Sequence, residues 1–152
     1  MRGTQLKLLG AFTLAALLAS PCWAQFARAE DAVKYRQGAW YVLAQHFTRI
    51  GAMVNGRTPY DARVAVENAE VVATLARWPS TGFVPGSERL SQKARPEIWT
   101  EQARFKEHND KLVNETARLV SAAKTQNLDQ LKAAYASTAA TCKSCHDAYR
   151  NN

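Results

Sequence analysis

The residues best suited to chemistry in this 152-residue chain lie near its C-terminus, in the run Cys142-Lys143-Ser144-Cys145-His146. The run has the spacing C-x-x-C-H, the attachment signal for a c-type haem. Positions three and four apart share one face of a helix, so both thiols and the imidazole project together. The thiols can add to the two vinyl groups of one porphyrin while the histidine reaches the iron. We predict one covalently bound haem c per chain, attached through Cys142 and Cys145, with His146 as an axial iron ligand.

Two other kinds of site also use closely spaced cysteines. A thioredoxin-like redox pair usually begins a helix that follows a strand, whereas this pair lies near the end of an expected C-terminal helix. A zinc site needs a second pair of ligands, and His46 and His108 are the only other histidines in the chain. The sequence therefore favours haem attachment over both alternatives.

The first 24 residues have the pattern of a secretory signal peptide. Arg2 and Lys7 are followed by an apolar run over 8–18, and small residues at Cys22 and Ala24 suit a cleavage site. The apolar run has about 11 residues, whereas a helix needs roughly 20 to span a bilayer. We therefore predict that the chain is exported and cleaved after Ala24.

Cleavage would leave a mature domain of residues 25–152 in the periplasm, with no membrane attachment. A lipid anchor on Cys22 is the alternative, and the neighbouring Trp23 disfavours it. Loss of the first 24 residues lowers the formal net charge from +7 to +5. The remaining positive charge is spread along the helices with no basic stripe, so we expect no nucleic-acid partner. A redox partner protein is not identified by the sequence.

The composition and periodicity of the mature domain favour helices. Glycine and proline are few, with 7 and 5 residues in the whole chain, and good helix formers are plentiful. Apolar residues recur every three or four positions in four segments, separated by proline, glycine or asparagine. The expected helices span 31–54, about 60–78, Glu97 to about Thr125, and about Leu128 to Arg150, with Asn127 as the expected cap of the last one and one long loop over 79–96. The apolar stripe of the second helix consists of Val64, Asn68, Val71, Leu75 and Trp78, and the stripes of the third and fourth helices include Phe105 and Tyr149. These features predict an all-α fold, an antiparallel four-helix bundle.

The ligand on the other side of the iron decides what a haem protein does. The apolar stripe of the first helix passes through Trp40, whose indole has only an N–H donor and cannot bind iron. At 100° per residue, Met53 lies about 220° and His46 about 240° from Trp40, so neither should reach a haem on that face. His108 on the third expected helix stays open as a sixth ligand.

Two arginines near the expected haem have two interpretations each. Arg36 and Gln37 lie one turn before Trp40, and Arg36 is either a snorkelling surface side chain or a donor to a haem propionate. Arg150 follows His146 by four residues. It either bonds a haem group or is a solvated cation that favours the end of the helix dipole. The sequence pattern leaves both choices open.

The combination of these features resembles cytochrome c′, the bacterial class II c-type cytochromes, over nearly all of 25–152. The resemblance is carried by four runs: residues 30–37 (EDAVKYRQ), 51–56 (GAMVNG), 95–99 (RPEIW) and 142–150 (CKSCHDAYR).

This resemblance implies a four-helix bundle, usually a homodimer formed through the first two helices. It implies a five-coordinate haem whose vacant face binds NO and CO while discriminating against O₂. Arg36 and Gln37 match the positions that meet a propionate, and Phe83 matches an aromatic residue near the haem edge. Arg150 matches the arginine beside the axial histidine, where NO can end up after displacing that histidine.

Trp40 departs from the family pattern, in which leucine, or methionine in six-coordinate electron carriers, stands at this position. Our hypothesis is that the bulky indole covers the open iron face and slows or weakens CO binding.

From the resemblance and the predicted signal peptide together, we predict a gas-binding periplasmic cytochrome that also takes part in electron transfer. The alternative is a six-coordinate, low-spin electron carrier without a gas-binding role. A peroxidase would need acid–base groups near the iron, and Trp40 is no general base, so we expect no enzyme activity.

Overall fold

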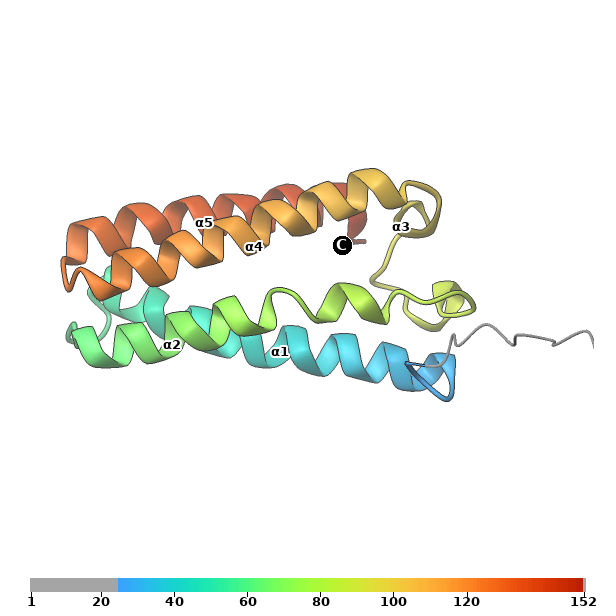
Figure 1. Cartoon of the computed structure of the whole chain (residues 1–152), viewed down its shortest axis with the longest axis horizontal. Helices are drawn as coiled ribbons and strands as arrows, with labels where there is room; N and C mark the ends of the chain where they lie inside the picture. The colour runs from blue at the N-terminus through green and yellow to red at the C-terminus, as the bar shows by residue number, and fades with distance from the viewer. Residues whose placement is uncertain (1–24, 152) are drawn as a thin grey trace, which may run out of the picture.

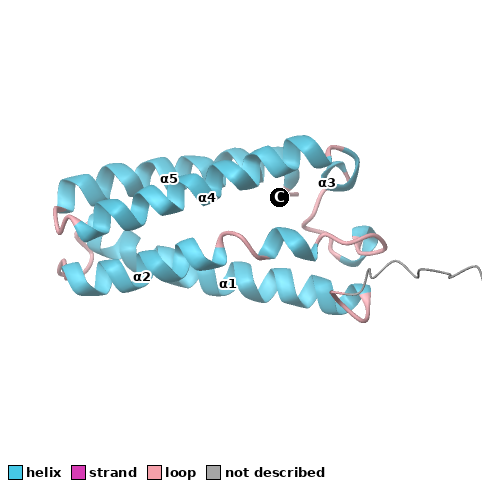
Figure 2. Ribbon diagram, viewed as in Figure 1, coloured by secondary structure: helices cyan, strands magenta, loops and turns pink. Residues whose placement is uncertain are grey.

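The computed structural model describes residues 25–151. The predicted signal peptide, residues 1–24, and residue 152 lie outside the described residues. Within 25–151 the chain forms five α-helices and two short 3-10 helices, and no strand (Figure 2). In chain order they are α1 (Ala29–Val54), α2 (Ala62–Leu75), η1 (Pro79–Gly82), η2 (Glu88–Leu90), α3 (Glu97–Thr100), α4 (Gln102–Lys124) and α5 (Leu128–Tyr149).

Four long helices form an antiparallel bundle, which confirms the predicted fold class. Figure 1 shows α1 beside α2 as one hairpin, and α4 beside α5 as a second hairpin lying along the first. Contacts between α2 and α4 and between α1 and α5 close the bundle. The short α3, both 3-10 helices and the C-terminal end of the chain gather at the end of the bundle where α1 begins (Figure 1).

Side-chain caps begin two of the long helices. Asp61 accepts a hydrogen bond from the backbone N–H of Val64 at the start of α2. Asn127, the cap expected from the sequence, accepts from the N–H groups of Asp129 and Gln130 at the start of α5. Such caps satisfy N–H groups that have no partner inside the helix, and they fix where α5 starts its path toward the cysteines.

Two predicted helices differ from the observed ones. The second helix ends at Leu75 instead of 78, because Trp78 N–H donates to the Leu75 carbonyl in a tightened turn just before Pro79. The third is interrupted at Glu101, whose backbone (φ −111°, ψ 43°) leaves the helical region and separates α3 from α4. The predicted loop over 79–96 also contains η1 and η2.

The inward face of α2 is only partly the expected one. The predicted stripe consists of Val64, Asn68, Val71, Leu75 and Trp78. Asn68 is buried, but Val64, Val71 and Leu75 are only partly buried and Trp78 is 49% exposed. The fully buried residues lie one position along and are small: Ala65, Ala69, Val72 and Ala76. Small side chains let neighbouring helices approach closely, which explains why the bulkier stripe lies at the margin.

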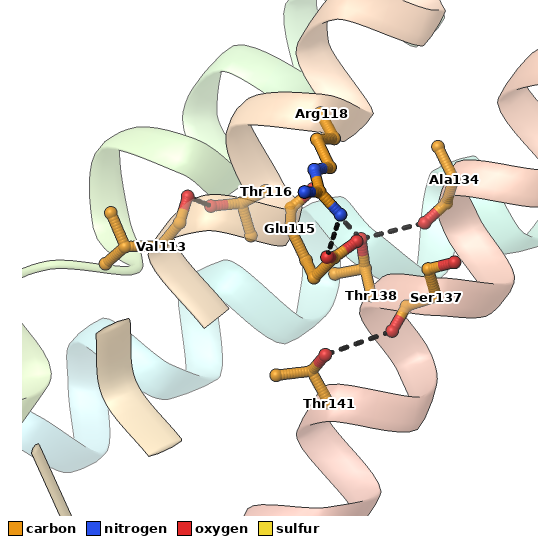
Figure 3. Close-up of polar contacts among 8 residues, drawn as sticks. All are labelled: Val113, Glu115, Thr116, Arg118, Ala134, Ser137, Thr138 and Thr141. Atoms are coloured by element: carbon orange, nitrogen blue, oxygen red, sulfur yellow. Dashed lines mark hydrogen bonds and ion pairs between the residues drawn. The ribbon is translucent and has the colours of Figure 1, made fainter. Parts of the chain in front are cut away.

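Threonine side chains are buried where α4 meets α5. Figure 3 shows Thr116 on α4 and Thr138 on α5, both almost fully buried. The Thr116 hydroxyl donates to the Val113 carbonyl at 2.9 Å, and the Thr138 hydroxyl donates to the Ala134 carbonyl at 2.9 Å. Each buried hydroxyl therefore has a partner in its own helix, which removes most of the cost of burying it.

None of the helices between residues 25 and 151 combines the length and the apolar character needed to cross a membrane.

Candidate functional site

The last three turns of α5 carry the C-x-x-C-H run. The thiols of Cys142 and Cys145 are both partly buried and are not joined in a disulfide. Burial raises the pKa of the Cys142 thiol, and burial together with the charge of Cys142 raises the pKa of Cys145 to about 11. Both sulfurs are thus available as neutral thiols on one side of α5. This geometry fits two thioether bonds to a single porphyrin.

His146 lies beside Cys145 with an exposed imidazole. Partial burial and the positive charge of Arg150 lower the pKa of this imidazole, and Asp147 opposes the shift. A lowered pKa favours the neutral ring, which is the form that binds a metal. His146 therefore remains the predicted axial iron ligand.

The chain just after α5 is tied to the segment before α3. An isolated antiparallel bridge joins Ala94 and Arg150. Within it, Arg95 N–H donates to the Tyr149 carbonyl at 3.0 Å and Asn151 N–H donates to the Lys93 carbonyl at 3.0 Å. These bonds fix the end of α5 and the course of Arg150 past His146. Arg150 and His146 line one pocket, so the structure brings this predicted pair together.

Arg36 is only 2% exposed, and its guanidinium holds the loop after α2 against α1. Nη1 donates to the Gly82 carbonyl at 2.6 Å and to the Ser87 hydroxyl at 2.8 Å, and Nη2 donates to the Ser87 carbonyl at 3.4 Å. The guanidinium also lies 4.3 Å from the ring centre of Phe83. Burial lowers its pKa, with Glu88 opposing the shift. Arg36 is therefore an interior residue and not a snorkelling surface side chain.

Gly82 makes this arrangement of Arg36 sterically feasible. A Cβ atom at Gly82 would lie 2.8 Å from the Ala32 carbonyl oxygen and 2.9 Å from the Arg36 Cβ. Only glycine permits η1 to approach α1 this closely and to present its carbonyl to Arg36. The guanidinium has five N–H donors, and three of them are used by described residues.

A series of aromatic contacts connects Phe83 with α5. The Phe83 ring lies edge-on to Phe105 at 5.0 Å, and Phe105 lies edge-on to Tyr149 at 5.4 Å. Trp99 packs on the other side of Phe83 at 5.5 Å. Such edge-to-face pairs are favourable beyond their area of contact. Arg36 and Phe83 are thereby held at the same end of the bundle as the C-x-x-C-H run.

Other residues of the first helix lie as follows. Gln37 is exposed, and Trp40 is partly buried against the apolar core. Met53 is also buried in that core, near the far end of α1. The His46 ring is 2.8 Å from the Asn68 side-chain oxygen on α2. His46 is therefore engaged by α2, and Met53 belongs to the apolar core toward the other end of α1.

His108 on α4 packs edge-on to Tyr149, with ring centres 5.5 Å apart. His108 thus lies near the C-terminal end of α5, and its contact there is with an aromatic ring.

The sequence did not predict that five residues of this region come together. They are Gly82, Ser87, Trp99, Phe105 and Tyr149. Helical spacing placed Phe105 and Tyr149 on inward stripes, but spacing alone does not show that they meet each other. Gly82 and Ser87 belong to a loop whose path depends on Arg36, which lies 46 and 51 residues earlier.

The cytochrome C′ family model matches residues 31–150. The chain belongs to the cytochrome c′ family. The curated cytochrome c′ of Alcaligenes xylosoxydans xylosoxydans is 46% identical over 126 residues, which cover 83% of this chain and 98% of the relative. Haem c, covalently bound, is accordingly the cofactor, as predicted from the C-x-x-C-H run.

Solved structures support the same family. The crystal structure of cytochrome c′ from Rubrivivax gelatinosus has a TM-score of 0.79 and 41% identity, covering 84% of this chain and all of that one. The nitric oxide complex of a single-residue variant of cytochrome c prime from Alcaligenes xylosoxidans also has a TM-score of 0.79, with 44% identity, covering 84% of this chain and 100% of that chain. The bundle described above is therefore the cytochrome c′ fold.

Proposed function

We propose that this protein is a periplasmic cytochrome with a five-coordinate haem, which binds NO and CO and takes part in electron transfer. The observation that carries the proposal is the contrast across the bundle. Cys142, Cys145 and His146 project from one side of α5, whereas Met53 and His46 on α1 are engaged elsewhere. The solved nitric oxide complexes of a 44% identical relative support gas binding as the family activity.

In this proposal Cys142 and Cys145 hold the haem by thioether bonds and His146 binds the iron. The haem supplies a redox-active iron with one open coordination position. Nε of Arg36 and one hydrogen on Nη2 donate to no residue within 25–151, so they are available for a propionate together with the exposed Gln37. Phe83 would then lie at the haem edge, since it packs directly on Arg36.

Arg150 is proposed to act beside the axial histidine. Two observations support this role: Arg150 and His146 line one pocket, and the positive charge of Arg150 lowers the pKa of His146. A guanidinium at this position can donate a hydrogen bond to a small ligand that approaches the histidine side of the iron.

CO titration of the reduced protein tests the proposal. We expect one CO to bind per chain, because the sixth coordination position is open. Binding should change the absorption spectrum from that of a high-spin haem to that of a six-coordinate, low-spin haem. A reduced protein that binds no CO and has a low-spin spectrum would instead support the six-coordinate electron carrier, with His108 as the ligand to examine first.

Trp40 is proposed to cover the open iron face, since it lies on the α1 side and is partly buried there. Trp40→Leu replaces the indole by a smaller side chain and should raise the CO association rate, measured by stopped flow on the reduced protein. Association at an unchanged or lower rate in Trp40→Leu would contradict this role. Gln45→Ala, at an exposed position of the same helix, serves as the control and should leave the rate unchanged.

Export is part of the proposal. Cleavage of a signal peptide spanning residues 1–24 would leave a mature protein that begins at Gln25. Mass spectrometry of protein isolated from the periplasmic fraction should find this N-terminus together with the added mass of one haem. A chain that retains residues 1–24 would contradict it.

A homodimer through α1 and α2 is also proposed. Large apolar side chains are exposed on this half of the bundle, with Tyr41 66%, Val42 43% and Trp78 49% exposed. Exposed apolar groups of this kind mark association surfaces when they lie together. Sedimentation of the mature protein should give twice the chain mass, and Tyr41→Lys should shift it toward the monomer.

We propose no catalytic activity, because Trp40 supplies neither an acid nor a base to a bound ligand.

A further inference from the structure

The pocket beside His146 is lined mainly by positively charged and polar side chains. Lys93 and Arg95 enter it from the segment before α3, and Arg150 enters it from the end of α5. Asn151 completes this side of the lining, and Asp147 is the one carboxylate that lines it. Asp147 forms an ion pair with Lys143 one turn earlier on α5. Three cations thus face a pocket whose single acidic group is already paired.

The three cations have no acidic partner of their own. Nine ion pairs within residues 25–151 neutralise other lysines and arginines. In this part of the chain, no carboxylate oxygen lies within 4.0 Å of Lys93, Arg95 or Arg150. Because no nearby carboxylate offsets their charge, these three side chains create a local excess of positive charge.

Hydrogen bonds hold together the two chain segments that carry the cations before any ligand arrives. The Ala94–Arg150 bridge joins the two segments that carry them. Arg95 Nη1 donates to the Ala148 carbonyl at 3.3 Å, and Asn151 Nδ2 donates to the Gln92 carbonyl at 2.8 Å. Because the segments are already fixed, a ligand need not order them, and its binding costs less free energy.

We propose that this pocket binds a small oxyanion next to the axial histidine. Arginine side chains donate paired hydrogen bonds that match the geometry of oxyanions, and lysine adds a point charge. The inference extends the proposed function, since an anion bound beside His146 stabilises the more positive, oxidised iron. It assigns Lys93 and Arg95 a binding role that the haem attachment itself does not need.

The haem's own propionates share this chemistry and are the competing occupant. If they fill the pocket, an added anion finds no site there. If the pocket takes a free anion, binding is saturable and independent of the propionates. The experiment is therefore designed to separate an added oxyanion from the carboxylates that the cofactor brings.

Sulfate is the probe, titrated by calorimetry into the haem-loaded mature protein, with sodium chloride holding the ionic strength constant. We expect one saturable site per chain. Lys93→Gln should weaken sulfate binding about tenfold, the effect of one lost charge-assisted hydrogen bond. The Lys93 backbone carbonyl still accepts from Asn151 in this variant, so the bridge is retained. Lys132→Gln, which removes an exposed lysine near the start of α5, is the matched control and should bind as the parent does.

The midpoint potential gives a second measurement on the same samples. If the oxidised protein binds sulfate tenfold more tightly than the reduced protein, saturating sulfate lowers the potential by about 59 mV. The absorption spectrum reports the iron ligands independently, so a failure of the anion site is distinguishable from a failure of the proposed haem coordination.

The absence of saturable sulfate binding would overturn the proposal. Equal weakening in Lys93→Gln and Lys132→Gln would overturn it as well, because the effect would then be one of net charge. A potential that changes in Lys93→Gln without any response to sulfate would assign the cations to the propionates and also overturn it.

Discussion

The two ends of the bundle are built differently. We call the end with the α1–α2 and α4–α5 turns, residues 55–61 and 125–127, the turn end. The opposite end, where α1 begins and α5 finishes, is the haem end (Figure 1). Near the turn end the helices are joined by apolar packing, and Phe47 of α1 stacks on Tyr135 of α5 with ring centres 4.3 Å apart. At the haem end the buried Arg36 holds a loop by hydrogen bonds to backbone and hydroxyl groups.

The difference separates stability from chemistry. The core cluster, which includes Ile50 and Leu131 with no exposed surface, extends toward the turn end and supplies apolar burial. The haem end keeps two thiols and an imidazole only partly covered, so they remain available to a cofactor. Hydrogen bonds and aromatic contacts position the side chains at the haem end. The site therefore lies on rigid helices, and its thiols and imidazole are not buried by apolar packing.

Removing the attachment cysteines should have the largest effect. In the double variant Cys142→Ser, Cys145→Ser, no covalent haem should remain, because a hydroxyl does not form the thioether bond. Haem staining of a denaturing gel gives the measurement. Cys22→Ser is the matched control and should keep full staining, since Cys22 lies in the predicted signal peptide; retained haem in the double variant would show a different attachment.

Removing the buried cation of the haem end should have the next largest effect. Arg36→Leu leaves the Gly82 carbonyl without its donor and removes the Arg36 bonds to Ser87, and we expect a loss of about 2–3 kcal/mol in the free energy of unfolding. Urea unfolding of the haem-loaded protein measures this. Arg49→Leu, at an exposed position of the same helix, should change the stability by less than about 0.5 kcal/mol. Equal effects of the two substitutions would mean that Arg36 does not hold the loop.

A glycine pair on α1 tests the tight packing toward the turn end. A Cβ at Gly51 would overlap the Tyr135 hydroxyl, and a Cβ at Gly38 meets nothing within 4 Å. Gly51→Ala should therefore cost about 1–3 kcal/mol through overpacking. Gly38→Ala should stabilise the helix by about 0.5–1 kcal/mol. Thermal unfolding compares them, and the cost of Gly51→Ala should fall in the Tyr135→Phe background. A neutral Gly51→Ala would indicate that this region is loosely packed.

Local pattern was sufficient for the features that depend on neighbours in sequence. The four long helices, the Asn127 cap and the shared face of Cys142, Cys145 and His146 all follow from spacing within a few residues. The buried face of α2 was mispredicted, because close helix approach selected small residues such as Ala65 and Ala69 over a larger stripe. The break at Glu101 carries no proline or glycine signal.

Long-range contacts were beyond sequence reasoning. Arg36 was recognised as a residue near the haem, yet its bonds to Gly82 and Ser87 depend on how a loop folds back over α1. The same holds for the Ala94–Arg150 bridge, which joins residues 56 positions apart in the chain. Such pairings are settled by tertiary geometry, and they determine which groups line the pocket beside His146.

The absorption spectrum of the purified mature protein, oxidised and reduced, tests the central claim most directly. We expect a coloured protein that retains its haem on denaturation and has high-spin bands in both states, because protein binds the iron on one side only. A colourless sample would contradict haem attachment. Low-spin bands in both states would show a protein ligand on each side of the iron and contradict the proposed open position.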